Sequence, residues 1–291
     1  MSLRVSILIC TINDRIKDVP ALLLPERADI EYVVSFQYTA SFFLDMVPSV
    51  LKERKDVKLF PLLSTGLSAN RNNALRHCAT ELAIIADDDA RYTEKQIDLV
   101  IQTFEEHPNV DIACFQACDA QHLPIKKYPP HSFDYAHRPK GYYFSSWEIA
   151  LRIDSPLSTF DTRFGLGASY LSCGEEEVFL HQSHKLGAKL RYFPQVLCTI
   201  PSSETTGSRF AIDTKVRRSK GAVLYMMHGF IGALLRITKF AITMPTPPSR
   251  WQAWRDMLDG IRYIFNNPLN EGVGNDIPLD FQPIDNWKLP S

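Results

Sequence analysis

The sequence lacks several features that would assign it at once to a class of protein. Lysine and arginine number 32 against 33 aspartates and glutamates, and the net charge of −1 argues against a general nucleic-acid binder. The six cysteines are scattered, and only Cys114 and Cys118 lie close together, without the second pair or histidine spacing of a zinc site. Most cysteines lie in apolar segments, so we expect buried thiols in a reducing cytosol.

Signals for secretion and for membrane crossing are also missing. Residues 3–10 look like a first strand and carry no cleavage pattern, so the sequence predicts no signal peptide. Residues 221–235 contain no Asp, Glu, Lys or Arg, but this stretch is shorter than the ~20 apolar residues that a span needs. We therefore expect a cytoplasmic protein.

The most informative stretch that is present reads LAIIADDD, at residues 82–89. Its apolar run predicts a strand buried on both faces, and open α/β sheets bind ligands at the carboxyl ends of such strands. Three adjacent carboxylates repel one another, and Mg²⁺ or Mn²⁺ would relieve that repulsion. The alternative is a plain strand-to-helix turn, because Thr93 and Gln96 have the spacing of a capping box for the next helix.

Strands and helices alternate along the first two thirds of the chain. With 291 residues, 45% of them hydrophobic, the chain can form one large α/β domain and an appendage. Ser68 is the predicted N-cap of a helix. This alternation predicts a mainly parallel sheet with helices on both faces. The expected strands are 5–10, 31–36, 57–60, 82–86, 111–116, 146–152 and 191–199, and the expected helices are 41–54, 69–79, 93–107 and 174–186, with a long loop or edge hairpin at 117–143.

The C-terminal part has a different pattern. Residues 216–265 predict two helices with wide apolar faces, a narrow polar stripe that includes Arg236 and Lys239, and the neighbouring Trp251 and Trp254. Such a hairpin could pack on the main domain, on a second subunit of a homo-oligomer, or on a membrane surface. We therefore divide the chain into a domain at 1–215, a helical segment at 216–265 and an irregular tail at 266–291.

Six short motifs occur in an order that resembles one family. They read VSILICT at 5–11, GLSANRN at 66–72, ADDD at 86–89, FDTRFG at 160–165, GEE at 174–176 and SETTG at 203–207. In this order they resemble the family 2 glycosyltransferases, over residues 3 to about 210. The resemblance implies a GT-A (Rossmann-like) fold, an α/β architecture with a mainly parallel mixed sheet covered by helices on both faces, here followed by a C-terminal helical hairpin.

The resemblance also implies roles for the aspartate triplet. In the family an acidic Asp-x-Asp element holds Mn²⁺ or Mg²⁺, and the cation stabilises the departing nucleoside diphosphate. Asp89 is the expected direct ligand, and Asp87 is expected to meet the metal through water or to bind the ribose. Asp88 is assigned to the nucleotide-sugar site with them.

Other donor-binding residues follow from the same resemblance. Thr11, Asn13 and Asp14 end the first strand, where the family holds the nucleotide base. Arg71 is expected to face the uracil or the phosphates, and its alternative role is that of an ordinary arginine on a helix surface. Gln37 stands where the family normally has aspartates, so it can hydrogen-bond a base but offers no charge.

The GEE motif resembles the Gly-Glu-Asp element that supplies the base in inverting members. Glu176 is therefore the expected base, which takes the proton of an acceptor hydroxyl, and Glu175 the expected acceptor-binding residue; the reverse assignment stays open. Many members also have a late histidine where this chain has Ile200, so the resemblance supplies no third metal ligand.

The function expected from the sequence is inverting, metal-dependent glycosyl transfer. The partners are a nucleotide-sugar donor, with a UDP-sugar favoured, and a glycan or lipid-linked acceptor of bacterial surface glycan synthesis, at the inner face of the cytoplasmic membrane. Two alternatives remain at this point. One is a catalytically silent sugar- or lipid-binding relative, and the other is a metal-dependent nucleotidyltransferase or sugar-nucleotide hydrolase, because a fold alone does not fix chemistry.

Overall fold

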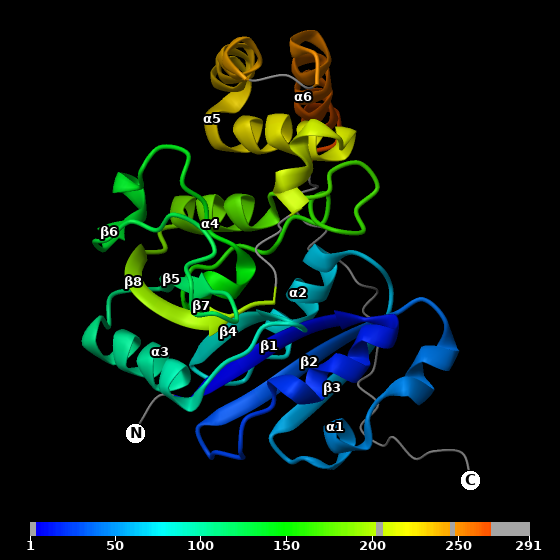
Figure 1. The fold of residues 1–291 in the computed structure, drawn as a ribbon, viewed down its shortest axis with the longest axis vertical. Coiled ribbons are helices and arrows are strands. Elements are labelled where there is room, and N and C mark those ends of the chain that lie inside the picture. The colour runs from blue at the N-terminus through cyan, green and yellow to red at the C-terminus, as the bar shows by residue number, and fades with distance from the viewer. Residues whose placement is uncertain (1–3, 202–205, 245–247, 269–291) are drawn as a thin grey trace.

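The computed structural model describes residues 4–201, 206–244 and 248–268, and its centre is one eight-stranded sheet (Figure 1). The strand order is β3-β2-β1-β4-β7-β5-β8-β6. β1, β2, β3 and β4 run parallel, β8 is parallel to β5, and β7 lies antiparallel between β4 and β5. The predicted mainly parallel mixed sheet is thus confirmed. The strands are β1 (Val5–Ile12), β2 (Ile30–Tyr38), β3 (Val57–Leu63), β4 (Leu82–Asp87), β5 (Ile112–Cys118), β6 (Phe133–Asp134), β7 (Ile149–Arg152) and β8 (Leu190–Thr199).

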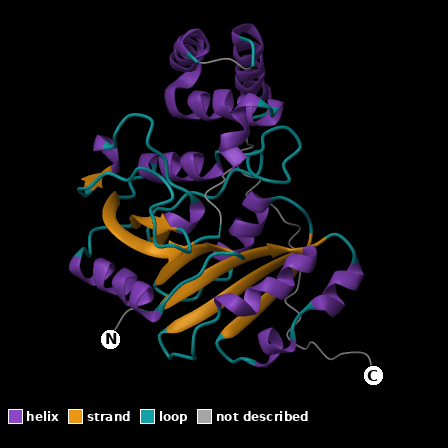
Figure 2. Ribbon diagram, viewed as in Figure 1, coloured by secondary structure: helices purple, strands orange, loops and turns teal. Residues whose placement is uncertain are grey.

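Helices cover both faces of the sheet because the central strands are apolar on both sides (Figure 2). Ile7 and Ile9 of β1 face a core that includes Ile97 and Phe104 of α3. Leu8, between them, faces the opposite core, which includes Ala74 of α2 and residues of α4. The helices are α1 (Ser49–Glu53), α2 (Leu67–Arg76), α3 (Glu94–Glu106), α4 (Glu175–Lys185), α5 (Thr214–Thr243) and α6 (Arg250–Asn266), with 3-10 helices at Asn13–Leu22, Ser41–Met46, Tyr135–His137, Ser146–Glu148 and Thr206–Ala211.

Two details of the predicted helices are wrong. The helix expected over 41–54 is divided into a 3-10 helix and the short α1, because Pro48, which has no N–H, stands between them. Ser68 is not the N-cap of α2, since Gly66 takes that position with a φ of 107°. The Ser68 hydroxyl instead donates to the carbonyl oxygen of Phe164 at 2.7 Å, which fixes the loop that precedes α4.

Two other local predictions hold. Thr93 and Gln96 form the expected capping box at the start of α3. The segment 117–143 is mostly irregular and includes the edge strand β6, which pairs antiparallel with β8.

The predicted C-terminal helical hairpin is formed by α5 and α6, which stand at one end of the molecule (Figure 1). Gly229, at a φ of 67°, bends α5 into two segments. The two helices cross closely, since a Cβ on Gly221 would lie 1.9 Å from the Met257 oxygen, and one on Gly260 equally close to the Arg218 oxygen. The predicted tail begins at 266, the last residue of α6, and 269–291 lie outside the described residues, as do 203–205 of the SETTG motif.

Candidate active site

A cavity of about 1380 Å³ opens at the carboxyl ends of β1 and β4. The aspartate triplet and Arg71 line it on the side of the sheet, and Glu175 and Glu176 line it at the start of α4. The first segment of α5 and part of the second complete its wall. Two groups of carboxylates that lie far apart in the sequence thus share one space.

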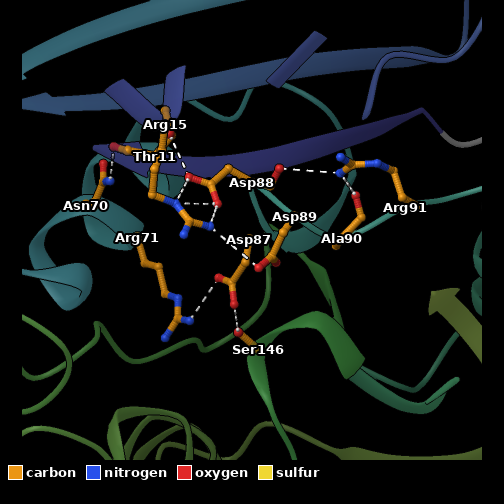
Figure 3. Close-up of polar contacts among 10 residues, drawn as sticks. All are labelled: Thr11, Arg15, Asn70, Arg71, Asp87, Asp88, Asp89, Ala90, Arg91 and Ser146. Carbon is orange, nitrogen blue, oxygen red and sulfur yellow. Dashed lines mark hydrogen bonds and ion pairs between the residues drawn. The ribbon is translucent and has the colours of Figure 1, made fainter. Parts of the chain in front are cut away.

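The three aspartates have different surroundings (Figure 3). Asp87 accepts from Ser146 Oγ at 3.2 Å and pairs with Arg71 at 3.2 Å. Asp88 is buried, and its carboxylate accepts from Thr11 Oγ1 at 2.8 Å and from two nitrogens of the Arg15 guanidinium. Asp88 therefore anchors the strand end and leaves no free carboxylate for a ligand.

Asp89 is the most open of the three. Its side chain is 45% exposed, and its only ion-pair contact within the described residues is Arg15 at 3.5 Å. Burial raises the pKa of Asp89, and the negative charges of Asp87 and Asp88 raise it further. The site therefore favours a cation beside Asp89, although the described residues contain no cluster of three metal-ligating side chains.

Arg71 is the charge at the centre of the site. Its side chain is only 2% exposed, so the alternative of a helix-surface arginine is wrong. Nη1 lies 3.1 Å from carboxylate oxygens of both Glu175 and Glu176, and Nη2 lies 3.2 Å from Asp87. In this structure Arg71 joins the aspartate group to the glutamate group.

Glu175 and Glu176 begin α4, after Gly174 in the left-handed conformation at a φ of 94°. Glu175 is buried, and burial together with the charge of Glu176 raises its pKa to about 8, against the opposing effect of Arg71. Its Oε2 has no hydrogen-bond partner among the residues described. Glu176 is more open, with a side chain that is 18% exposed.

The residues predicted to bind the nucleotide base do not all reach the cavity. Thr11 and Gln37 line it, and Gln37 donates to Ser64 Oγ and to the Gly66 oxygen. Asn13 and Asp14 do not line it. The Asn13 side chain accepts from the Thr39 backbone N–H at 2.9 Å, and Asp14 points to solvent. The structure does not bring these two residues to the cavity, because β1 continues to Ile12 and the chain then turns away in a 3-10 helix.

Sequence reasoning missed several residues of the site. Arg15 was not predicted, although a cation one residue beyond Asp14 could have been suspected as the partner of an aspartate triplet. Ser146 and the α5 residues Lys220, His228 and Arg236 carried no recognisable motif, and only the fold brings them to the cavity or its aspartates.

A match between the sequence and a family profile assigns the chain to a family. Residues 6–155, about half of the chain, match the profile described as Glycosyl transferase family 2. The chain belongs to glycosyl transferase family 2. Its reaction class is therefore glycosyl transfer, which favours this activity over the silent-relative and nucleotidyltransferase alternatives. A search of curated proteins found no match.

Solved structures share the family 2 architecture of this chain. The structure of residues 1–349 of S. aureus TarS matches with a TM-score of 0.56 and 14% identity, over 89% of this chain and 81% of that one. The same TarS fragment in complex with UDP-GlcNAc matches with a TM-score of 0.56 and 13% identity, over 89% and 82% of the two chains. The UDP complex gives 0.54 and 14%, over 89% and 81%. At this identity the likeness establishes the GT-A fold.

Proposed function

We propose that this enzyme is an inverting, metal-dependent glycosyltransferase that moves a sugar from a nucleotide sugar to a hydroxyl group of a glycan or lipid-linked acceptor. The observation that carries the proposal is one cavity with an open aspartate on one wall and a pair of glutamates on another, joined by the buried Arg71. Glycosyl transfer needs one group of side chains that holds the phosphates of the donor and a second group that supplies a base for the acceptor. The aspartate wall and the glutamate wall of the cavity can take these two roles.

A uridine nucleotide sugar is the proposed donor. Structures of TarS, which shares the fold, are described with UDP and with UDP-GlcNAc. In this chain the buried Thr11 and Gln37 line the cavity at the ends of β1 and β2, where ligands bind in open α/β sheets. The Gln37 amide nitrogen already donates to Ser64 and Gly66, and its carbonyl oxygen can accept a hydrogen bond from a base.

The residues of the site fit a bound Mn²⁺ or Mg²⁺. Four carboxylates, those of Asp87, Asp88, Asp89 and Glu176, face two guanidinium groups, those of Arg15 and Arg71. The pKa of Asp89 is raised first by burial and then by the negative charges of Asp87 and Asp88. Asp89 would hold the metal directly and Asp87 more remotely, and the cation would supply charge stabilisation for the leaving diphosphate.

Glu176 is the proposed base. At neutral pH the buried Glu175 keeps its proton, because its pKa is raised to about 8, so it is a poor proton acceptor. Glu176 would take the proton of the acceptor hydroxyl while that oxygen attacks the anomeric carbon from the side opposite the leaving group. Glu175, with a carboxyl oxygen that has no partner in the described residues, would hydrogen-bond the acceptor.

The proposed setting is the bacterial cytoplasm, in the synthesis of surface glycans. All six cysteines are free, which fits a reducing compartment. The acceptor would be a polysaccharide or a lipid-linked glycan that the open cavity can admit.

A donor screen followed by product analysis tests the proposal. We expect one nucleotide sugar, in the presence of Mn²⁺, to raise the melting temperature more than the others do. Incubation of that donor with glycan and polyprenyl-linked acceptors should give a glycoside with inverted anomeric configuration by NMR. A retained configuration, release of free sugar alone, or a new nucleotide sugar would each contradict the proposed reaction.

A further inference from the structure

We propose that the distal part of the helical pair, residues 230–243 of α5 and the first turns of α6, is a docking surface for a membrane of anionic phospholipid. This inference concerns where the enzyme sits and goes beyond the reaction that it catalyses. Three independent features of the described residues support it.

The first feature is an exposed apolar surface shared by the two helices. Ile231, Leu235 and Ile242 are 74%, 66% and 61% exposed, and their successive spacings of four and seven residues place them on one side of α5. Trp251 of α6 is 68% exposed and stacks on Trp254. The indole N–H of Trp254 donates to Thr238 Oγ1 at 3.0 Å. Thr238 lies on the same side of α5 as these three apolar residues, so the exposed apolar side chains of α5 and the tryptophan pair of α6 form one apolar stripe.

The second feature is the charge around this surface. Residues 230–255, which include the distal segment of α5 and the start of α6, contain four lysines and arginines but no aspartate or glutamate. Lys239 follows Leu235 by one turn of α5, and Arg255 follows Trp251 by one turn of α6, so basic side chains border the apolar stripe on both helices. Arg236, Lys239, Arg250 and Arg255 are exposed and form no ion pair with any carboxylate of the described residues.

This combination selects an anionic bilayer over a second copy of the chain. Basic residues are attracted to an anionic leaflet, and tryptophan suits the headgroup region. Two copies that met through this surface would bring like charges together, which disfavours self-association.

The third feature is the bend at Gly229, which lets α5 lie on a membrane rather than cross it. By length and composition α5 is the one helix of the described residues that could span a bilayer. However, its distal segment is only 14 residues long, about 21 Å, and a hydrocarbon core is about 30 Å thick. One face of that segment, at Ala233 and Ile237, packs on α6. Only the opposite face is left for lipid.

The proximal segment of α5 belongs to the catalytic domain. Ser219 Oγ accepts from the backbone N–H of Ser172 at 2.9 Å, and Ala222 is buried with Phe164 and Val178. Arg217 is not part of the exposed basic surface, because its side chain is buried in an ion pair with Asp256 at 2.7 Å. The hairpin is therefore packed on the domain at one end and exposed at the other.

Docking through the distal segment would also place the active site near lipid. Arg236 and Phe240 of that segment line the same cavity as Asp89 and Glu176. If the proposed function holds, a lipid-linked acceptor could then enter from the membrane surface.

Vesicle sedimentation with the full chain tests the inference. We expect the protein to pellet with vesicles of phosphatidylcholine and phosphatidylglycerol, to stay in solution with phosphatidylcholine alone, and to be released by high salt. The paired variant Lys239→Glu/Arg255→Glu and the paired variant Leu235→Ser/Trp251→Ser should each bind about ten-fold more weakly.

Matched controls change the same residue types elsewhere. The variant Lys55→Glu/Lys95→Glu and the variant Leu63→Ser alter exposed positions remote from the helical pair, and both should bind vesicles like the unchanged protein. Melting curves and thermal stabilisation by donor check that each variant is folded and that its donor site is intact.

Several results would overturn the inference. They are equal binding to neutral vesicles, no binding to either kind, equal losses in the control variants, and retention on vesicles at high salt and alkaline pH as for a spanning helix. A dimer in light scattering that Leu235→Ser/Trp251→Ser abolishes, without vesicle binding, would identify the surface as a self-association site instead. Failure of the reaction itself would leave vesicle binding unchanged, so the two proposals can fail separately.

Discussion

At the scale of single residues, Arg71 is the side chain on which the site depends most. It is buried among three carboxylates that come from β4 and α4. Removing one partner of a buried ion pair leaves the other charges uncompensated, which costs far more than the pair itself contributes.

We therefore expect Arg71→Met to lower the free energy of unfolding by about 3–5 kcal/mol, measured by urea denaturation. The double variant Arg71→Met/Glu176→Gln should recover part of this loss, because one of the carboxylates that lost its partner is then neutral. A single variant as stable as the unchanged protein would show that solvent, not Arg71, compensates the glutamates.

The two glutamates of α4 should respond differently to amide substitution. Glu176→Gln should bind donor normally and lose transfer, because only proton removal is disabled. Glu175→Gln should retain more activity at neutral pH, where Glu175 is already protonated. An active Glu176→Gln beside an inactive Glu175→Gln, in a direct assay of the glycoside product, would reverse the assignment.

The raised pKa of Glu175 also predicts a pH dependence of stability. Between its ordinary pKa of 4.5 and about 8, the folded protein holds a proton on Glu175 that the unfolded chain has lost. The free energy of unfolding should therefore fall as pH rises through this window, and Glu175→Gln should remove that part of the slope. Urea denaturation of both proteins from about pH 5 to about pH 8 measures the difference, and parallel curves would contradict it.

Asp89 is the residue whose substitution tests the metal site. Asp89→Asn keeps the shape of the side chain but removes a charged ligand, so we expect activity to fall by at least about 100-fold and Mn²⁺ to lose its effect on nucleotide binding. Asp14→Asn changes an exposed aspartate outside the cavity and serves as the matched control. Full activity of Asp89→Asn, or of the unchanged enzyme in EDTA, would exclude the proposed metal role.

At the scale of elements, the crossing of α5 and α6 depends on two glycines. The absence of side chains at Gly221 and Gly260 lets each helix approach the backbone of the other, where a Cβ would meet an oxygen at 1.9 Å. The buried Arg217–Asp256 pair lies close by and fixes the same crossing.

Gly260→Ala should therefore force the two helices apart, although alanine is the better helix former. We expect a loss of about 1–3 kcal/mol in the free energy of unfolding, as in overpacked cores. Gly232→Ala, away from the α6 backbone, is the comparison; its added methyl group would meet the His228 side chain at 2.8 Å, so we expect a smaller loss there than at Gly260. A gain in stability for Gly260→Ala would mean that helix propensity outweighs the close approach.

At the scale of the whole molecule, the C-terminal helices belong to the folded core as well as to the exposed end. Val216, Ser219 and Ala222 are buried, and Val223 packs against the loop that carries Gly174. A chain that ends after Thr214 would uncover Phe164, Leu171 and Val178 of that core.

We expect this truncated chain to melt at a lower temperature and to bind donor more weakly than the full chain. The domain at 1–215 would then depend on the helical segment for its stability. Exposure of several buried apolar side chains, at about 1.5–3 kcal/mol each, is the reason. Thermal melts with and without donor measure both effects, and a truncated protein with the melting temperature and donor affinity of the full chain would contradict the prediction.

Features that depend on local patterns were predictable from the order of the amino acids. Apolar runs of the right length predicted strands 5–10 and 82–86 within β1 and β4, and Thr93 with Gln96 predicted the start of α3. The order of short motifs indicated the family and placed an aspartate triplet at the end of a central strand. These inferences succeed because burial pattern and capping act over a few neighbouring residues.

The three-dimensional fold sets which of these polar residues are free and which are engaged. Asp88 is tied to Arg15, 73 residues away, and Arg71 reaches Glu175 and Glu176 across 104 and 105 residues. It also decided that Asn13 turns to Thr39 and that α5 is packed before Gly229 and exposed after it. An ion pair depends on distance in space, and side chains so far apart in the chain meet only once the sheet and its helices have formed.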